Sequence, residues 1–467
     1  MAEDLKPLAT EKFLPCQPPT PRLSEDEVVP PDRDGGRHIL RNFTLMSVLF
    51  SANHGCVEAC LGLATSRLGS IGARQSGILY FSYTASSLLG ATYVVKRMGA
   101  RDALLLGMGL YCAYVGCFFV AAFFLWDGVM GRVAAYSGAA IGGVGAGILW
   151  TAQGVYFGRA AEEHSWRTDQ PTAVSTASLA GIFASWLLGG GVVLRLLSTL
   201  LIEAGASWGA VFGTYTAVAL LSTAAMPCVH NFSHAAARDG DGRAESVFYK
   251  VTAAGQLLVR DPKMKYMFGL NATFGFAAAF LNSYVNGQVV PDARYIGIFS
   301  AWVSVVAAGA SVVFGRISPT VGKDVVLIVG ALCFLGVVLP FVVVPDAGAY
   351  GWTSLFAVYS LQGVGRATFE GTLKARFADF FPNEKEGAFA NIIFQSGLCS
   401  AIGYVLTFSL LCDDPSFRYC IQYSDGTLHD VLTFELIVVI SSIVAILGYL
   451  RASTLYRKQQ LFISIPT

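Results

Sequence analysis

The sequence has few charged residues for its length. Asp, Glu, Lys and Arg make up 13% of the 467 residues, whereas hydrophobic residues make up 54% and the mean hydropathy is +0.55. A soluble protein of this size contains about a quarter charged residues. The ten cysteines lack metal-ligand spacing, and there is neither a Ser/His/Asp set nor an accessible cofactor fingerprint. We therefore expect no enzyme, no metal or cofactor site and no nucleic-acid partner.

Long apolar stretches fill most of the chain. A transmembrane helix needs roughly 20 mostly apolar residues, and only structures that satisfy their own backbone hydrogen bonds can span a bilayer. The sequence predicts an all-α membrane protein with twelve spans, at residues 40–62, 76–95, 103–125, 133–157, 174–199, 208–226, 264–287, 295–314, 324–344, 351–373, 387–411 and 431–450.

One long polar interruption divides these spans into two sets of six. We predict a disordered cytoplasmic tail at 1–37, which holds seven of the 17 prolines in its first 35 residues and has no apolar core for a cleaved signal peptide. The N-terminal half then covers 38–226, the cytoplasmic connector 227–262, the C-terminal half 263–451 and a cytoplasmic tail 452–467.

The basic residues lie mainly on one side of the predicted membrane. With a cytoplasmic N-terminus, 25 of the 32 Lys and Arg fall in cytoplasmic loops and tails. The opposite loops hold only Arg67, Arg74, Arg132, Arg294 and Arg418. This asymmetry follows the positive-inside rule and predicts that both termini are cytoplasmic. Plasma membrane and endolysosomal membrane are both compatible with the sequence.

A short basic loop with glycine recurs after the second and the eighth span. In the first half it contains Lys96, Arg97, Gly99, Arg101 and Asp102, and in the second half Gly315, Arg316, Gly322, Lys323 and Asp324. Glycine permits a tight turn, and the basic groups can pair with carboxylates and helix ends when two halves move. We interpret these segments as conformational-switch loops; the alternative is two ordinary positive-inside loops.

Several runs resemble one transporter-related family. They are Gly77-Ile78-Leu79-Tyr80-Phe81-Ser82-Tyr83, then Val95-Lys96-Arg97-Met98-Gly99-Ala100-Arg101, then Gly145-Ala146-Gly147-Ile148-Leu149-Trp150-Thr151-Ala152-Gln153-Gly154-Val155-Tyr156, and Pro382-Asn383-Glu384-Lys385-Glu386-Gly387-Ala388-Phe389-Ala390-Asn391. On these residues the chain resembles the uncoordinated-93-like family of the major facilitator superfamily. The resemblance implies the superfamily fold, in which two six-helix halves enclose a cavity lined by spans 1, 4, 7 and 10.

The amide and ionisable residues within the spans follow that implied cavity. An ionisable group at the bilayer centre is costly and usually faces protein or water. The candidates for a substrate or ion pathway are Asn53, His54 and Glu58 in span 1, Trp150 and Gln153 in span 4, Asn282 and Asn286 in span 7, and Gln362, Arg366 and Glu370 in span 10.

Two pairs in this set have helical spacing. His54 and Glu58 are four residues apart and share a helix face, which suits either proton coupling or a structural hydrogen bond between helices. Arg366 and Glu370 repeat the spacing, as an ion site or an intrahelical clamp. Arg195, near the outer end of span 5, is interpreted as an arginine that extends its stem towards lipid headgroups, and the alternative is a functional role.

Two cysteines stand in the predicted outer loop between spans 11 and 12. Cys412 and Cys420 can form a disulfide in an oxidising compartment, and the alternative is two free thiols.

Two function classes remain. The first is a secondary transporter that moves a small solute or ion through the bilayer by alternating access. The second is a membrane chaperone or regulatory subunit with a channel or receptor as partner, because members of the family resembled include one type that associates with potassium channels and another that escorts nucleic-acid-sensing receptors. Fold alone does not choose between them.

Overall fold

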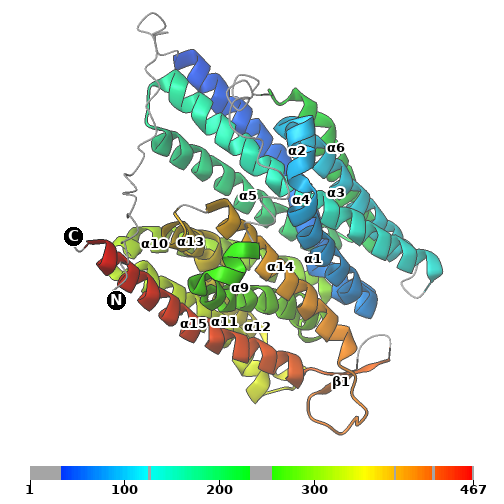
Figure 1. Cartoon of the computed structure of the whole chain (residues 1–467). Coiled ribbons are helices and arrows are strands. Elements are labelled where there is room, and N and C mark those ends of the chain that lie inside the picture. The colour runs from blue at the N-terminus through cyan, green and yellow to red at the C-terminus, as the bar shows by residue number, and fades with distance from the viewer. Residues whose placement is uncertain (1–32, 125–127, 232–254, 383–384, 423–425, 465–467) are drawn as a thin grey trace, which may run out of the picture.

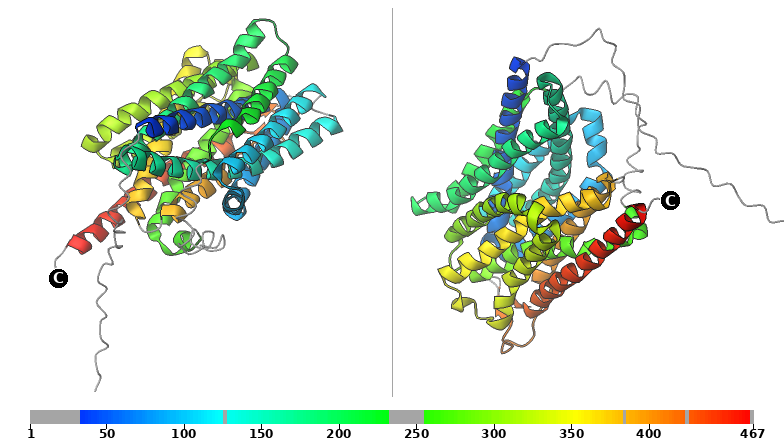
Figure 2. Two further views of the ribbon diagram at one scale, coloured as in Figure 1. Left: turned by 90° about the horizontal axis from the view of Figure 1, so that it is seen from above. Right: turned by 90° about the vertical axis from the view of Figure 1, so that its left-hand side faces the viewer.

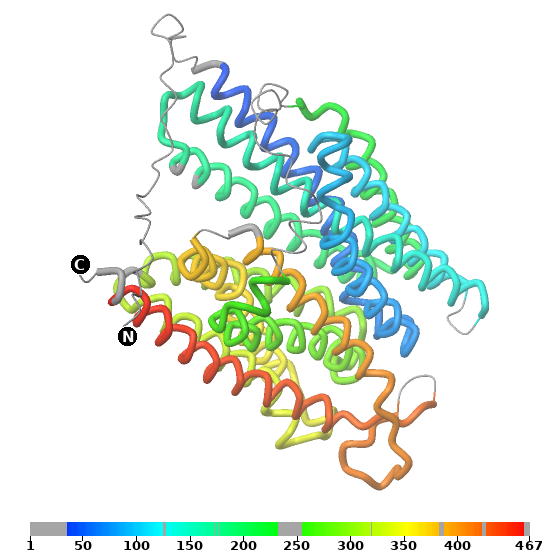
Figure 3. The backbone as a smooth tube through the Cα atoms, viewed as in Figure 1, coloured from blue at the N-terminus to red at the C-terminus, as the bar shows by residue number. Residues whose placement is uncertain are grey.

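The structure consists of two packed bundles of long helices (Figures 1 and 3). This computed structural model describes residues 33–124, 128–231, 255–382, 385–422 and 426–464. The first bundle contains α1 (Arg33–Leu89), α2 (Ala91–Met98), α3 (Ala100–Phe123), α4 (Val129–Thr168), α5 (Thr172–Glu203), α6 (Trp208–Ala225) and the short turn η1 (Met226–Cys228). We call it the N half.

The second bundle, the C half, follows the connector. Its main helices are α9 (Pro262–Phe280), α10 (Ile296–Val321), α11 (Lys323–Val343), α12 (Trp352–Ala367), α13 (Lys374–Phe380), α14 (Lys385–Ser409) and α15 (Leu432–Ser464). Shorter helical elements are η3 (Leu281–Val289), η4 (Ala293–Tyr295), η5 (Ala347–Ala349) and η6 (Thr368–Leu373). Strands β1 (Cys420–Gln422) and β2 (Leu428–Asp430) pair antiparallel before α15.

Helix α1 contains both of the first two predicted spans. Gly69 breaks it with φ 55° and ψ −134°, a backbone conformation that glycine adopts readily. The chain then turns back on itself, and the two segments approach closely at this turn. A Cβ on Gly72 would lie 2.0 Å from the Ala64 carbonyl oxygen. The loop predicted between these two spans is thus helical on both sides of Gly69.

The described helices fit an all-α membrane protein. Eight of them are long and apolar enough to cross a membrane, and the bent pair of α1 and α2 adds a ninth. Division of α1 at Gly69, together with α9–η3 and α12–η6, gives one helical segment for each of the twelve predicted spans. Two predicted tails differ in part: α1 already begins at Arg33, and α15 remains helical to Ser464. The rest of the N-terminal tail and residues 232–254 of the connector lie outside the described residues.

The two ends of the molecule differ. We call the end where α1 begins and α15 finishes the tail side, and the end with β1 and β2 the hairpin side (Figure 1). On the hairpin side a disulfide joins Cys412 to Cys420. Gly99 and Gly322 stand at equivalent tail-side turns and share nearly the same backbone, with φ 87° and 88°. This repetition supports the predicted likeness of the two loops.

Contacts between the halves gather near the hairpin side and the middle of the helices. Asn286 donates to the Gly62 carbonyl over 3.0 Å, and the Thr199 hydroxyl donates to the Arg294 carbonyl over 2.5 Å. Further in, a Cβ on Gly397 would lie 2.3 Å from the Thr84 hydroxyl. The views in Figure 2 show the ribbons of the two halves side by side along this interface.

The apolar core has the same asymmetry. One cluster runs from the N half into the hairpin side of the C half, where it includes Phe280, Tyr284 and Phe341. A separate cluster, with Met264, Phe377 and Tyr449 among its members, lies at the tail side of the C half. Because the shared core is on the hairpin side, burial of apolar surface holds the halves together there.

Candidate functional site

Glu58 is the centre of a charged cluster inside the helix bundle. Its Oε1 lies 3.6 Å from His54 Nε2, one turn earlier in α1, and 3.6 Å from Arg366 Nη2 of α12. Its Oε2 accepts a hydrogen bond from Arg195 of α5. The charge-assisted hydrogen bond from Arg195 and the nearby Arg366 guanidinium tie the Glu58 carboxylate electrostatically to two other helices. We call Glu58, His54, Arg195, Arg366 and Glu370 the charge cluster.

Arg195 links the N half to the C half. It is 8% exposed, and besides Glu58 it donates to the Ser304 hydroxyl of α10. The interpretation of Arg195 as a headgroup-seeking arginine is therefore wrong, because its guanidinium points into protein. A signal in the sequence was available: Glu58 and Arg195 each precede the outer end of a predicted span by four residues, so opposite charges lie at equal depth. Ser304 gave no such signal.

Arg366 forms a second link between the halves. Its Nε donates to Glu370 over 2.8 Å within the same helical region, which is the predicted four-residue pair, and its Nη2 reaches towards Glu58 of the N half. Glu370 lies in η6, where the helix widens to a π-helical turn. Such turns are frequent at functional sites. The clamp and the ion site are thus parts of one arrangement.

The side chains of the charge cluster are unequally buried. Side-chain exposure is 9% for Arg195, 20% for Arg366, 23% for Glu58 and 36% for Glu370. Arg195 is thus the most buried of these four charged groups, and Glu370, towards the tail side of α12–η6, is the most exposed.

Aromatic side chains form one wall of the site. The His54 and Trp150 rings lie 5.1 Å apart edge to face, and Phe50 contacts Trp150 at the same ring separation. Tyr111 stacks on His54 at 5.9 Å. Trp150 therefore packs directly against the charge cluster, and Gln153 is half-buried about one turn further along α4.

The remaining predicted pathway residues divide between two locations. Gln362 is 4% exposed and lies one turn before Arg366, and its Oε1 has no hydrogen-bond partner among the described residues. Asn286 bonds the Gly62 carbonyl and the Tyr359 hydroxyl, and it lies 3.4 Å from Asn282. These two asparagines are in η3, a second π-helical segment. Asn286 connects the two halves near the hairpin side through its hydrogen bond to Gly62.

Asn53 lies away from the charge cluster, which corrects its prediction as a pathway residue. It is fully buried within the N half and donates to the Ala219 carbonyl over 3.2 Å and to the Thr223 hydroxyl over 3.0 Å. As the neighbour of His54 it points about 100° away around the helix, towards α6. It therefore serves helix packing.

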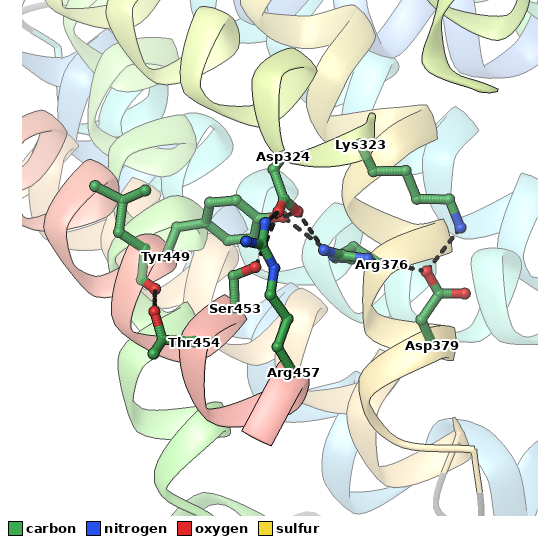
Figure 4. A network of polar contacts seen from close by, with 9 residues as sticks. Lys323, Asp324, Arg376, Asp379, Tyr449, Ser453, Thr454 and Arg457 are labelled. Atoms are coloured by element: carbon green, nitrogen blue, oxygen red, sulfur yellow. Dashed lines mark hydrogen bonds and ion pairs between the residues drawn. The ribbon is translucent and has the colours of Figure 1, made fainter. Parts of the chain in front are cut away.

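The predicted switch loops hold unequal networks on the tail side. Asp324, at the start of α11, binds Arg376, Tyr449, Ser453 and Arg457, and Lys323 pairs with Asp379 at 2.7 Å (Figure 4). In the N half Asp102 pairs with its neighbour Arg101 at 2.8 Å. Lys96, Arg97, Gly315 and Arg316 are exposed. The ion pairs of Asp324 and Lys323 join helices within the C half, whereas the Arg101–Asp102 pair lies within α3.

Comparison with known proteins identifies the architecture. The family model described as Major Facilitator Superfamily matches residues 43–408. Protein unc-93 homolog A of Homo sapiens is 23% identical over 413 residues, covering 79% of this chain and 86% of the relative. UNC93-like protein 3 of Arabidopsis thaliana is 24% identical over 397 residues, covering 79% and 81%. These relatives confirm the predicted resemblance to the uncoordinated-93-like family.

Solved transporter structures share the fold. The inward open conformation of the xylose transporter XylE from E. coli has a TM-score of 0.60 at 15% identity, covering 87% of this chain and 95% of that chain. The nucleoside transporter NupG has a TM-score of 0.61 at 13% identity, covering 88% and 99%. At these identities the likeness concerns the fold, and it confirms the predicted all-α membrane architecture.

Proposed function

We propose that this chain, which belongs to the major facilitator superfamily, is a secondary transporter that moves a small solute or ion by alternating access. The observation that carries the proposal is the charge cluster. Its two arginines each bridge the N half and the C half, Arg195 through Ser304 and Arg366 through Glu58. A site whose ligating groups come from both halves changes whenever the halves rock.

Coupling to protons is the second part of the proposal. Glu58 and His54 lie 3.6 Å apart, and neither side chain is fully buried, with 23% and 12% of their surfaces exposed. A carboxylate that accepts a proton loses its attraction for Arg195 and Arg366, so protonation loosens the tie between the halves. Unlike a structural hydrogen bond between helices, this arrangement links the protonation of one residue to the contacts of both halves.

The orientation that we propose has both tails in the cytoplasm. The Cys412–Cys420 disulfide is on the hairpin side, which suits an oxidising exoplasmic or lumenal space. The basic side chains of the loops and tails are then on the opposite face. Both plasma membrane and endolysosomal membrane fit this arrangement.

Reconstitution of the purified full-length chain into proteoliposomes tests the proposal. We expect saturable uptake of a solute from a panel of ions, amino acids and sugars with this protein alone. Glu58→Gln should lower that uptake and remove most of its pH dependence. Arg132→Gln, a change at an exposed arginine on the hairpin side, is the matched control and should leave uptake unchanged.

Absence of flux, together with stable co-purification of a larger membrane protein from native membranes, would contradict the transporter proposal. That outcome would favour the regulatory or chaperone class. An unchanged pH profile in Glu58→Gln would remove proton coupling and leave transport in place.

A further inference from the structure

We propose that the substrate is a small organic monoanion, such as a carboxylate, and that it binds Arg366 and Arg195 in place of Glu58 once that residue is protonated. This inference rests on the proposed function and names the substrate class of the same site. Its starting point is that Glu58 already occupies the position of a bound anion, between Arg195, Arg366 and His54.

The charges of the cluster favour an anion over a cation. The charges of the two arginines balance those of Glu58 and Glu370. Protonation of Glu58 leaves one positive charge without a partner among these five residues, and an uncompensated charge in a largely buried site is costly. A monoanion restores neutrality, whereas a cation would add a second positive charge. The proton and the anion therefore bind with positive cooperativity.

The geometry assigns separate tasks to the two arginines. Arg195 is fixed, since one of its Nη atoms donates to Ser304 and the other to Glu58. Arg366 donates through Nε to Glu370. Its Nη2 lies 3.6 Å from Glu58, which is too far for a hydrogen bond. Its outer N–H groups are thus the donors most available to a carboxylate, which a guanidinium binds with two parallel bonds.

The surroundings indicate that the anion has an apolar body. Trp150 and Phe50 lie on one side of His54, and Tyr111 stacks against its ring. Tyr80, in the second segment of α1, stacks on Tyr404 of α14 at 5.6 Å. Aromatic surface beside two arginines suits a carboxylate or sulfonate on a flat or branched carbon skeleton.

The titratable and charged groups that face Glu58 come from its own helix segment and from four neighbouring segments of the bundle. They are His54 on its own helix segment, Tyr80 on the second segment of α1, Tyr111 on α3, Arg195 on α5 and Arg366 on α12, the last paired with Glu370. Since Glu58 is the carboxylate that touches both arginines, its proton controls anion binding.

Anion binding to the purified full-length chain provides the first test, with benzenesulfonate as the probe because it stays ionised and does not cross lipid as a neutral acid. Stabilisation against heat, followed by tryptophan fluorescence over a concentration series, gives the affinity. In the natural chain we expect affinity to rise by about tenfold per pH unit of acidification, since one proton accompanies one anion. Choline and glucose should not stabilise the protein.

Three variants separate the roles. Glu58→Gln should bind benzenesulfonate at neutral pH with no further gain in acid. Arg366→Lys should lose about tenfold or more in affinity, because lysine keeps the charge and not the forked donors. Arg132→Gln, a folded control with an exposed arginine removed, should match the natural chain. A pH-independent affinity in the natural chain, or equal affinity in Arg366→Lys, would overturn the inference.

A flux measurement distinguishes failure of the inference from failure of the proposed function. Proteoliposomes that contain a pH-sensitive dye should acidify internally when benzenesulfonate is added outside. Uptake of choline or glucose without any response to the anion would overturn the substrate class and leave transport intact. Anion binding without flux of any probe would support the anion site and contradict transport.

Discussion

At the scale of single residues, the main result is a buried ion cluster shared by two helix bundles. His54 and Glu58 could be predicted as a pair from their four-residue spacing, because a helix fixes which of its own residues are neighbours. The position of Arg195 in its span places it at the same depth as Glu58, but the contacts of Arg195 with Glu58 and Ser304 depend on how the helices rotate and tilt against one another. The prediction of Asn53 as a pathway residue was wrong for a related reason, because adjacent positions on one helix face different neighbours.

Arg195→Gln tests the energetic role of this cluster. It leaves Glu58 without its closest cationic partner and removes the donor to Ser304. We expect a loss of about 2–5 kcal/mol in the free energy of unfolding, measured as a lower melting temperature in detergent or nanodiscs. The double variant with Glu58→Gln should recover part of the loss. Additive effects of the two changes would show that the residues do not interact in solution.

At the scale of elements, close backbone approach decides where the helices can reverse. Gly72→Ala would place a methyl group 2.0 Å from the Ala64 carbonyl oxygen, so the two segments of α1 cannot keep their packing. We expect a large fall in the monodisperse fraction seen by size-exclusion chromatography. Gly109→Ala in α3 is the matched control, because nothing lies within 4 Å of its Cβ position. Equal behaviour of the two variants would contradict the described turn.

The two switch loops should differ in their contribution to stability. Asp324 is 20% exposed and binds two arginines, whereas Asp102 is 41% exposed and pairs with its neighbour. Asp324→Asn should cost about 1–3 kcal/mol, and Asp102→Asn less than about 1 kcal/mol. Thermal unfolding of both variants in the same detergent gives the comparison. A larger effect at Asp102 would mean that the N-half loop has partners beyond Arg101.

At the scale of the whole molecule, the fold was accessible from sequence because apolar length and basic asymmetry are properties of the chain itself. The bilayer thickness sets the length that predicts the twelve spans. The span that corresponds to α9–η3 could be predicted although its asparagines interrupt the apolar run. The continuation of the first helix to residue 68 could not be predicted, because the sequence of a short polar connector between spans does not distinguish a loop from a helix. Which end of the bundle is closed also depends on packing between the halves, which single-helix patterns do not encode.

The closed hairpin side predicts how the halves move. Spin labels on Glu162 of α4 and Thr320 of α10, both exposed on the tail side, should report a long distance that shortens when the transport cycle reaches the opposite state. Labels at Arg132 and Asp346 on the hairpin side should lengthen in parallel. Pulsed electron–electron double resonance in nanodiscs at neutral and acidic pH measures the distances of both label pairs. Distances that do not change in either pair under any solute or pH would contradict rocking of the halves.

The bend at Gly69 gives α1 a double attachment. Its first segment holds Glu58, and its second segment packs along α14 of the opposite bundle, through Gly77 and Tyr80 against Tyr404. The protonation site on the first segment and the surface that packs against the other half are therefore connected through the bend at Gly69. A substitution that changes this bend should alter how strongly protonation of Glu58 is coupled to movement of the halves.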